Sequence, residues 1–382
     1  MSAAKAKSQR LAYMDNLRAL AMLAGVVFHT SLAYSPLLHD FWPTADAEKS
    51  RMVDAVAWFS HLFRMPLFFV IAGFFVALLV GKVGTIAMLR HRVMRVGVPF
   101  LLFWPLIYFS LSLLTTYAAN NVLNLSPMLR HVEQWLATAN RQTPWPSLMH
   151  LWFLPYLMCF CVLVWVAKTL EISGLAQRFA TLPPWVLIAV APLLLVVPLA
   201  SVAAPVPAPE SIFPQWWALV FFGCYFLFGY QLFAHQPLIE KLQRFAPWLM
   251  LGALGLYAAF YWLLSVGNLF QFKPMLHIVK AVLEAYAGAW MTLWCLIAGR
   301  LWLNTSNQFL RYLANASYWV YLVHLPILFA IQYSLLDVEA PWMAKFIAST
   351  IATLIICFIS YQLLVRHTVL GTLLNGRRQG VN

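Results

Sequence analysis

Two ionisable residues stand out because they lie in the first apolar stretch, Leu11 to Pro36. Arg18 and His29 are eleven residues apart, close to a whole number of helical turns, so they share one face about 16 Å apart along the axis. The near-neutral pKa of imidazole suits His29 to act as a general base or a nucleophile. Arg18 is suited to bind an anion, with Asp15 one turn earlier to orient it. A snorkelling arginine and a packing histidine are the structural alternatives, but together on one face they favour a site.

A second basic group precedes a later apolar stretch. It contains Arg90, Arg92 and Arg95, of which the last two share a helical face. Guanidinium groups bind phosphate through paired hydrogen bonds. Anchoring at a membrane surface explains one or two of these arginines, whereas a phosphate-bearing donor such as a nucleotide thioester explains all three. We therefore expect them to bind the donor.

A third set of ionisable and aromatic residues lies near the ends of apolar stretches, on the membrane side opposite to the three arginines. Ionisable groups deep in a bilayer cost about 2–3 kcal/mol each, so we expect them to converge on one wet vestibule above His29. Pro66 is expected to bend its helix and aim Arg64 inward. Trp152 is expected to stack on a sugar ring. The predicted acceptor-binding residues are His61, Arg64, His150, Trp152, Glu284, Tyr321 and His324.

The composition indicates the elements that must position these residues. The chain has 382 residues, 63% of them hydrophobic and 10% charged, with a mean hydropathy of +0.76. A soluble domain cannot bury that much apolar surface, so we predict a single domain, residues 1–382, that is an all-α polytopic membrane bundle. Residues 1–10 are expected to be a disordered tail and 367–382 a cytoplasmic tail. About ten transmembrane helices are predicted, near 17–35, 57–80, 96–118, 150–167, 185–204, 215–233, 247–266, 278–299, 312–334 and 343–364.

The net charge of +13 follows from membrane topology rather than from nucleic-acid binding. With the N-terminus cytoplasmic, sixteen Lys and Arg residues fall on the cytoplasmic side and eight on the other, where most acidic residues also lie. This distribution predicts that both termini are cytoplasmic. The five cysteines lie in apolar runs without metal-ligand spacing, so neither a metal site nor a bound cofactor is predicted.

Four stretches, in order along nearly the whole chain, resemble the membrane acyltransferase family 3. They are Met14–Ala19 running on to FHTSLAYS, His61–Gly73 (HLFRMPLFFVIAG), Arg92–Pro99 (RVMRVGVP) with His150–Leu154 (HLWFL), and Asn315–Pro326 (NASYWVYLVHLP). Within the family they are similar to members that transfer succinyl groups to periplasmic glucans. The resemblance implies a ten-span bundle in the bacterial inner membrane, an acyl-CoA donor substrate and a saccharide hydroxyl as acceptor. It also implies functional roles for His29, Arg18 and the Arg92–Arg95 region.

A different class of function also fits the residues. Polar side chains that line a helical bundle suit a carrier or flippase for a glycan or an anion, with Arg18 and His29 as a relay for the substrate. A structural subunit of a glycan-synthesis complex would leave the buried ionisable groups unexplained. Hydrolysis or transfer of acyl-CoA by the purified protein separates an enzyme from a carrier. Association into a homo-oligomer is left open by the sequence.

Overall fold

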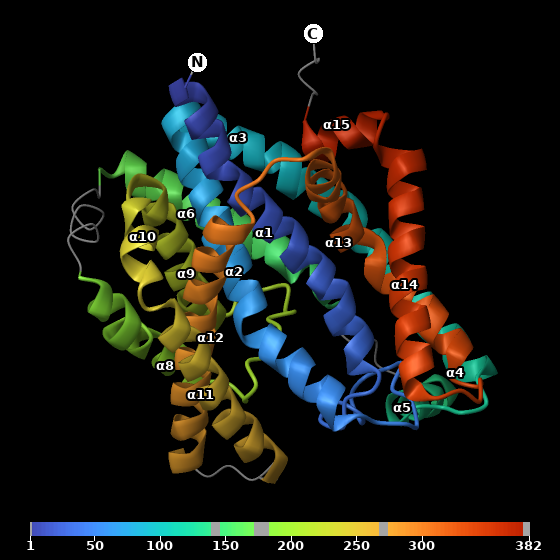
Figure 1. Cartoon of the computed structure of the whole chain (residues 1–382). Coiled ribbons are helices and arrows are strands. Elements are labelled where there is room, and N and C mark those ends of the chain that lie inside the picture. Colours follow the sequence, from blue (N-terminus) through green and yellow to red (C-terminus); the bar gives the residue numbers. More distant parts are fainter. Residues whose placement is uncertain (1, 139–145, 172–182, 267–273, 377–382) are drawn as a thin grey trace.

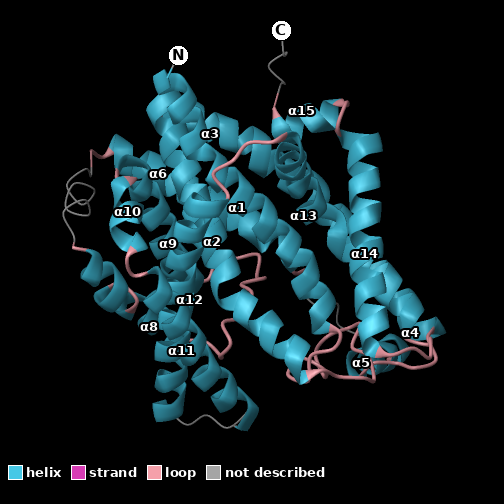
Figure 2. Ribbon diagram, in the orientation of Figure 1, coloured by secondary structure: helices cyan, strands magenta, loops and turns pink. Residues whose placement is uncertain are grey.

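The computed structural model describes residues 2–138, 146–171, 183–266 and 274–376, with side chains from residue 12 onward (Figure 1). Within these ranges the secondary structure is entirely helical (Figure 2). The predicted all-α class is therefore confirmed. A membrane-spanning helix satisfies its backbone hydrogen bonds within itself, which explains why the long apolar runs adopt this structure.

The helices follow one another in a continuous series along the chain. The first half contains α1 (Ser2–Leu32), α2 (Arg51–Val83), α3 (Thr85–Arg92), the π-helix η1 (Val93–Gly97), α4 (Val98–Asn121), α5 (Pro127–Ala137), the 3-10 turn η2 (Met149–Trp152) and α6 (Phe153–Thr169). The second half contains η3 (Val186–Val190), α8 (Leu193–Ala200), α9 (Trp216–Ala234), α10 (Pro237–Gln243), α11 (Ala246–Val266), α12 (Pro274–Trp302), α13 (Gln308–Leu335), α14 (Trp342–Ser360), η4 (Tyr361–Val365) and α15 (Val369–Asn375).

Eight helical segments within the described residues are long and apolar enough to cross a membrane. They correspond to eight of the ten predicted spans. The other two predicted spans coincide with α1 and with the shorter apolar segment Val186–Ala200. The chain is thus a multi-pass helical protein, and the count of ten stays a prediction.

Helix α1 lies between α2 and α13, and α13 packs in turn against α14 (Figure 1). The start of α1 and the helix α15 lie at the same end of the bundle, which we call the terminal end (Figure 1). The opposite end carries α5 and the loop of residues 33–50, and we call it the loop end. Helices α2 and α9 approach each other closely, because Gly73 and Gly229 let each backbone contact the other helix.

The structure differs from two expectations about the ends of the chain. Residues 2–10, expected to be a disordered tail, form the first turns of α1, consistent with their content of Ala, Lys, Gln and Arg. The expected C-terminal tail contains α15, and residues 377–382 lie outside the described part. Pro66 lies inside α2, which runs from Arg51 to Val83, and the bend expected at this residue stays a prediction.

Candidate active site

Three histidines from separate segments meet on the loop-end side of the bundle. His29 lies near the end of α1, His150 in η2 and His324 in the middle of α13. The ring centroid of His29 lies 5.3 Å from that of His324 and 6.4 Å from that of His150. The rings of His150 and His324 are 4.9 Å apart. The packing of α1 against α13 thus brings together residues far apart in the sequence.

Backbone carbonyls fix the tautomers of the neighbouring histidines. A carbonyl oxygen only accepts, so the ring nitrogen facing it carries the proton. Nε2 of His150 and Nδ1 of His324 both donate to the Tyr321 carbonyl, at 3.0 and 2.9 Å. Nε2 of His61 donates to the Val206 carbonyl at 2.7 Å. The opposite nitrogens of these three rings are buried without a partner. In the neutral rings each offers a lone pair to a hydroxyl group.

His29 is not held in this way. Its Nδ1 is buried without a partner, and no hydrogen bond within the described residues fixes its tautomer. The ring is positioned instead by aromatic contacts, including the edge of Phe28 at 5.2 Å between ring centroids. An imidazole whose tautomer is not fixed can take a proton on one nitrogen, as a general base requires.

Arg64 contributes a fixed positive charge next to the histidines. It projects from α2, is 5% exposed, and lies over the Phe28 ring with its Cζ 4.1 Å from the ring centroid. His61 stacks on the same ring. Nε and Nη1 of Arg64 are buried without a partner, and none of the ion pairs within the described residues includes it. A buried guanidinium without a counter-ion is costly, so this position suits an anionic ligand group.

Sequence reasoning missed the residue that covers His29. Trp42, from the loop of residues 33–50, lies nearly parallel to the His29 ring, with 6.1 Å between centroids and an interplanar angle of 16°. Its Nε1 is buried without a partner. A tryptophan in a polar loop is common at membrane surfaces, so its sequence position carried no signal for this role.

The remaining predicted acceptor residues have other contacts. Oε1 of Glu284 accepts a 2.7 Å hydrogen bond from Val206 N, so this carboxyl holds the segment that carries the His61 partner. Tyr321 donates from its hydroxyl to the His150 carbonyl at 2.8 Å and thereby orients that turn. Trp152 packs among aromatic residues, with Phe222 at 5.0 Å between centroids, rather than presenting a free face to a sugar.

A separate basic cavity of about 300 Å³ lies on the terminal-end side of the bundle. Arg18, Arg92, Arg95 and Lys82 contribute the charges, and Nε of Arg92 is buried without a partner. The hydroxyl of Tyr318 donates to the Arg95 carbonyl at 3.1 Å and supports η1. The other walls are largely apolar: Met22, Phe68, Ile71, Ala72, Phe75, Leu78, Leu79, Val96, Phe153, Leu154 and Leu157.

Two further predictions concern this basic cavity. The predicted contact between Asp15 and Arg18 is confirmed, since the two form an ion pair of 3.1 Å. Arg90 is exposed and does not line the cavity, unlike the other two arginines predicted with it. The helical spacing accounts for the difference, because only Arg92 and Arg95 share the inward face.

The two sites lie along one helix. Arg18 lines the basic cavity and His29 joins the histidine cluster, about 16 Å further along the axis of α1. Between them, Gly25 has no neighbouring atom within 4 Å of the position that a Cβ would take. The cations of the basic cavity suit phosphate groups, and the histidine cluster, further along the same helix, holds an imidazole base near a buried cation.

Comparisons with known proteins identify the family to which the chain belongs. The family model for the acyltransferase 3 family, described as an acyltransferase domain, matches residues 11–362. The chain is 27% identical to glucans biosynthesis protein C of Salmonella typhimurium and of Salmonella typhi, over 96% of this chain and 94% of each relative. No solved structure matches the chain. With a family model covering nearly all its length, and with its apolar helices, the chain belongs to the acyltransferase 3 family of membrane proteins.

Proposed function

We propose that this protein is a bacterial inner-membrane O-acyltransferase that moves an acyl group from cytoplasmic acyl-CoA to a hydroxyl of a periplasmic glucan. The observation that carries the proposal is the histidine cluster, in which His29 lies beside Arg64 and three tautomer-fixed histidines. The related glucans biosynthesis protein C supports the acceptor class. The basic residues predicted on the terminal end support a cytoplasmic orientation of that end.

The donor is proposed to enter through the basic cavity. Arg18, Arg92, Arg95 and Lys82 present the cationic groups that bind the phosphates of CoA. The apolar walls suit the pantetheine arm, which carries the thioester toward the histidine cluster. The length of α1 between Arg18 and His29 separates a phosphate-binding end from a reacting end.

The chemistry proposed for His29 is general-base catalysis. A nitrogen of His29 takes the proton of the acceptor hydroxyl as its oxygen attacks the thioester carbonyl. The resulting tetrahedral oxyanion collapses, the C–S bond breaks, and the CoA thiolate leaves and is protonated by the His29 imidazolium. The free nitrogens of His150 and His324 are suited to accept hydrogen bonds from neighbouring hydroxyls of the acceptor. Transfer through an acyl-His29 intermediate is the variant of this mechanism.

The acyl group is proposed to be succinyl. Arg64 is buried and has no carboxylate partner within the described residues. The free carboxylate of a succinyl group would form a charge-assisted pair with this guanidinium, whereas an acetyl or a longer alkyl group would leave it unpaired. With five N–H donors, the guanidinium can also contact the oxyanion.

The test is transfer by the purified protein in lipid nanodiscs. Succinyl-CoA is supplied with a neutral glucose oligosaccharide, and mass spectrometry measures the succinylated product while a thiol reagent measures released CoA. We expect product that requires both substrates, with acetyl-CoA a poorer donor. Oligosaccharide movement across a vesicle membrane without consumption of acyl-CoA would contradict an acyltransferase and identify a carrier.

A further inference from the structure

A larger cavity, of about 660 Å³, lies at the loop end, away from the histidine cluster. Three connecting segments form it: the 33–50 loop, the α4–α5 connection with the start of α5, and the α13–α14 connection. Its polar lining includes His39, Asp46, Glu48, Arg130, Glu339 and Lys345. The volume falls in the range of ligand-binding pockets in proteins.

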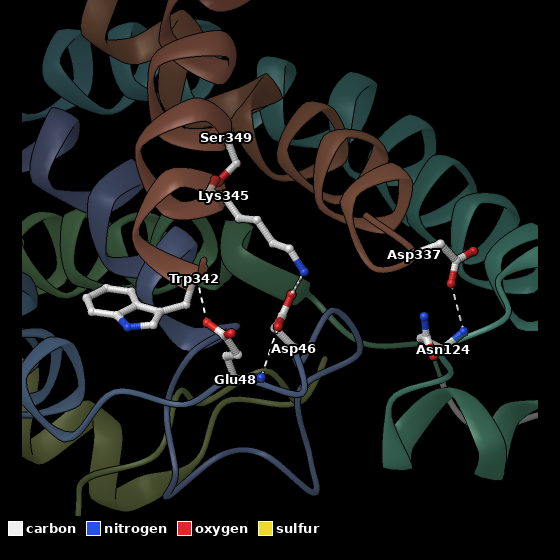
Figure 3. A network of polar contacts seen from close by, with 7 residues as sticks. All are labelled: Asp46, Glu48, Asn124, Asp337, Trp342, Lys345 and Ser349. Atoms are coloured by element: carbon white, nitrogen blue, oxygen red, sulfur yellow. Dashed lines mark hydrogen bonds and ion pairs between the residues drawn. The ribbon is translucent and has the colours of Figure 1, made fainter. Parts of the chain in front are cut away.

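Polar contacts hold the walls of this loop-end cavity in place (Figure 3). Lys345 Nζ donates to Asp46 Oδ2 at 2.8 Å, and both side chains are less than 10% exposed. Glu48 accepts from Trp342 N at 2.7 Å and so joins the loop to the start of α14. The Leu123 and Asn124 amides donate to Asp337 and hold the pKa of its carboxyl below the usual value. The cavity is therefore a built feature of the fold.

The groups that remain available differ from those that hold the walls. The side chains of Arg130 and Glu339 are exposed and form no ion pair or hydrogen bond within the described residues. Nδ1 of His39 is buried without a partner, and burial lowers the pKa of its imidazole, so the ring is neutral near pH 7. Glu48 forms no ion pair in the described part of the chain and keeps its carboxylate charge, so outside the Asp46–Lys345 pair the cavity offers one cation, two carboxylates and one neutral ring.

This mixture of both signs of charge favours a neutral ligand with many hydroxyl groups. An anion would meet the carboxylates of Glu48 and Glu339, and a cation would meet Arg130 and Lys345. Sugar hydroxyls, in contrast, both donate and accept, so they can use all of these groups. The lining has few large apolar residues, chiefly Leu125, Leu336 and Val338, which leaves little surface for the acyl chains of a lipid.

The loop of residues 33–50 connects this cavity to the histidine cluster. Its Trp42 covers His29, while its residues 45–48 line the loop-end cavity. Thr44, between them, donates to Gln332 Oε1 at 2.7 Å, and Gln332 Nε2 donates to the Thr30 carbonyl at 3.2 Å. A chain molecule bound in the cavity therefore lies beside the segment that covers the catalytic histidine.

We propose that the loop-end cavity is a saccharide subsite that binds sugar residues of the acceptor other than the one acylated at His29. This proposal rests on the acyltransferase function proposed above. A distant subsite increases the local concentration of acceptor hydroxyls at His29 without taking part in the chemistry.

The direct test measures binding without acyl-CoA. Glucose tetrasaccharides of several linkages are titrated into nanodisc-embedded protein, and saturation-transfer NMR and calorimetry report binding. We expect Arg130→Gln combined with Glu339→Gln to weaken binding roughly tenfold or more. Arg51→Gln combined with Glu133→Gln is the matched control, since both residues are exposed at the loop end but do not line the cavity. Equal affinity in the wild type and the cavity variant, or no binding by the wild type, overturns the subsite.

A second readout separates this proposal from the proposed function. If transfer occurs, the cavity variant should raise the KM for the oligosaccharide and leave the KM for acyl-CoA unchanged; an unchanged acceptor KM overturns the subsite. If no transfer occurs but tetrasaccharide binding still depends on Arg130 and Glu339, the subsite stands and the acyltransferase mechanism fails. Loss of a bound phospholipid from the cavity variant in native mass spectrometry, with unchanged sugar binding, would assign the cavity to a lipid headgroup instead.

Discussion

At the scale of single residues, His29 differs from the histidines around it because no carbonyl holds its proton. We predict that His29→Ala lowers kcat by about 10²-fold or more, as expected for loss of a general base. Measured release of CoA by the purified variant checks the prediction. His131→Ala is the control, because His131 is exposed on α5. Near-normal turnover in the His29 variant would remove this residue from the mechanism.

Arg64 has opposite expected effects on activity and on stability. Arg64→Met keeps much of the side-chain volume but removes a buried charge that has no counter-ion. We therefore expect the apparent Tm to stay level or rise, while transfer from succinyl-CoA falls roughly 30-fold or more through loss of the charge pair. Transfer from acetyl-CoA should fall less. The measurements are thermal unfolding and a comparison of the two donors. A markedly lower Tm would show that Arg64 has a structural role.

At the scale of helices, the contact between α2 and α9 depends on two glycines. A Cβ at Gly229 would collide with the backbone of Val70, so the helices must separate to accept it. We predict that Gly229→Ala destabilises the protein by about 1–3 kcal/mol, the usual cost of overpacking. Gly255→Ala is the matched control, since no atom lies within 4 Å of a Cβ there. Thermal unfolding in detergent compares the two variants, and equal midpoints would contradict the predicted collision.

Two arginines near the end of α3 allow a matched comparison at the basic cavity. Arg92 lines that cavity and Arg90, two residues earlier, does not. We predict that Arg92→Ala weakens CoA binding about tenfold, because one charged hydrogen bond to phosphate is lost, while Arg90→Ala has little effect. Calorimetric titration with CoA measures both. The same affinity in both variants would indicate that these arginines only anchor the helix at the membrane surface.

The sequence predicted helices better than it predicted contacts between them. Each of the ten apolar stretches contains helix, and spacing within one helix correctly paired Asp15 with Arg18. Helical periodicity does not fix how neighbouring helices are rotated, so Glu284 and Trp152 were expected at the acceptor site but contact Val206 and Phe222. Loop residues have no such period. For that reason neither the packing of Trp42 over His29 nor the loop-end cavity could be predicted from the sequence.

At the scale of the whole molecule, the proposed reaction requires the basic cavity and the loop end to face opposite sides of the membrane. We predict that a cysteine introduced by Lys49→Cys reacts with an impermeant thiol reagent in intact spheroplasts. A cysteine introduced by Ser306→Cys should react only after permeabilisation, because the distribution of basic residues predicts that the terminal end faces the cytoplasm. Both positions are exposed. The unaltered chain controls for its five native cysteines, and reversed labelling would invert the proposed orientation.

The contacts of the loop of residues 33–50 bear on the order in which the parts of the protein fold during synthesis. This segment lies near the start of the chain but forms hydrogen bonds with α13 and α14, near its end. The bonded pairs are Thr44 with Gln332, Asp46 with Lys345 and Glu48 with Trp342, and they are separated by 288, 299 and 294 residues in the sequence. Contacts between residues so far apart in the sequence form late in folding, because most of the intervening chain must first be synthesised and inserted. We therefore expect Trp42 to pack over His29 only after α13 and α14 have joined the bundle. His29, the proposed base, would enter the membrane among the first residues and be enclosed among the last, so we expect a nascent or truncated chain to carry an incomplete site.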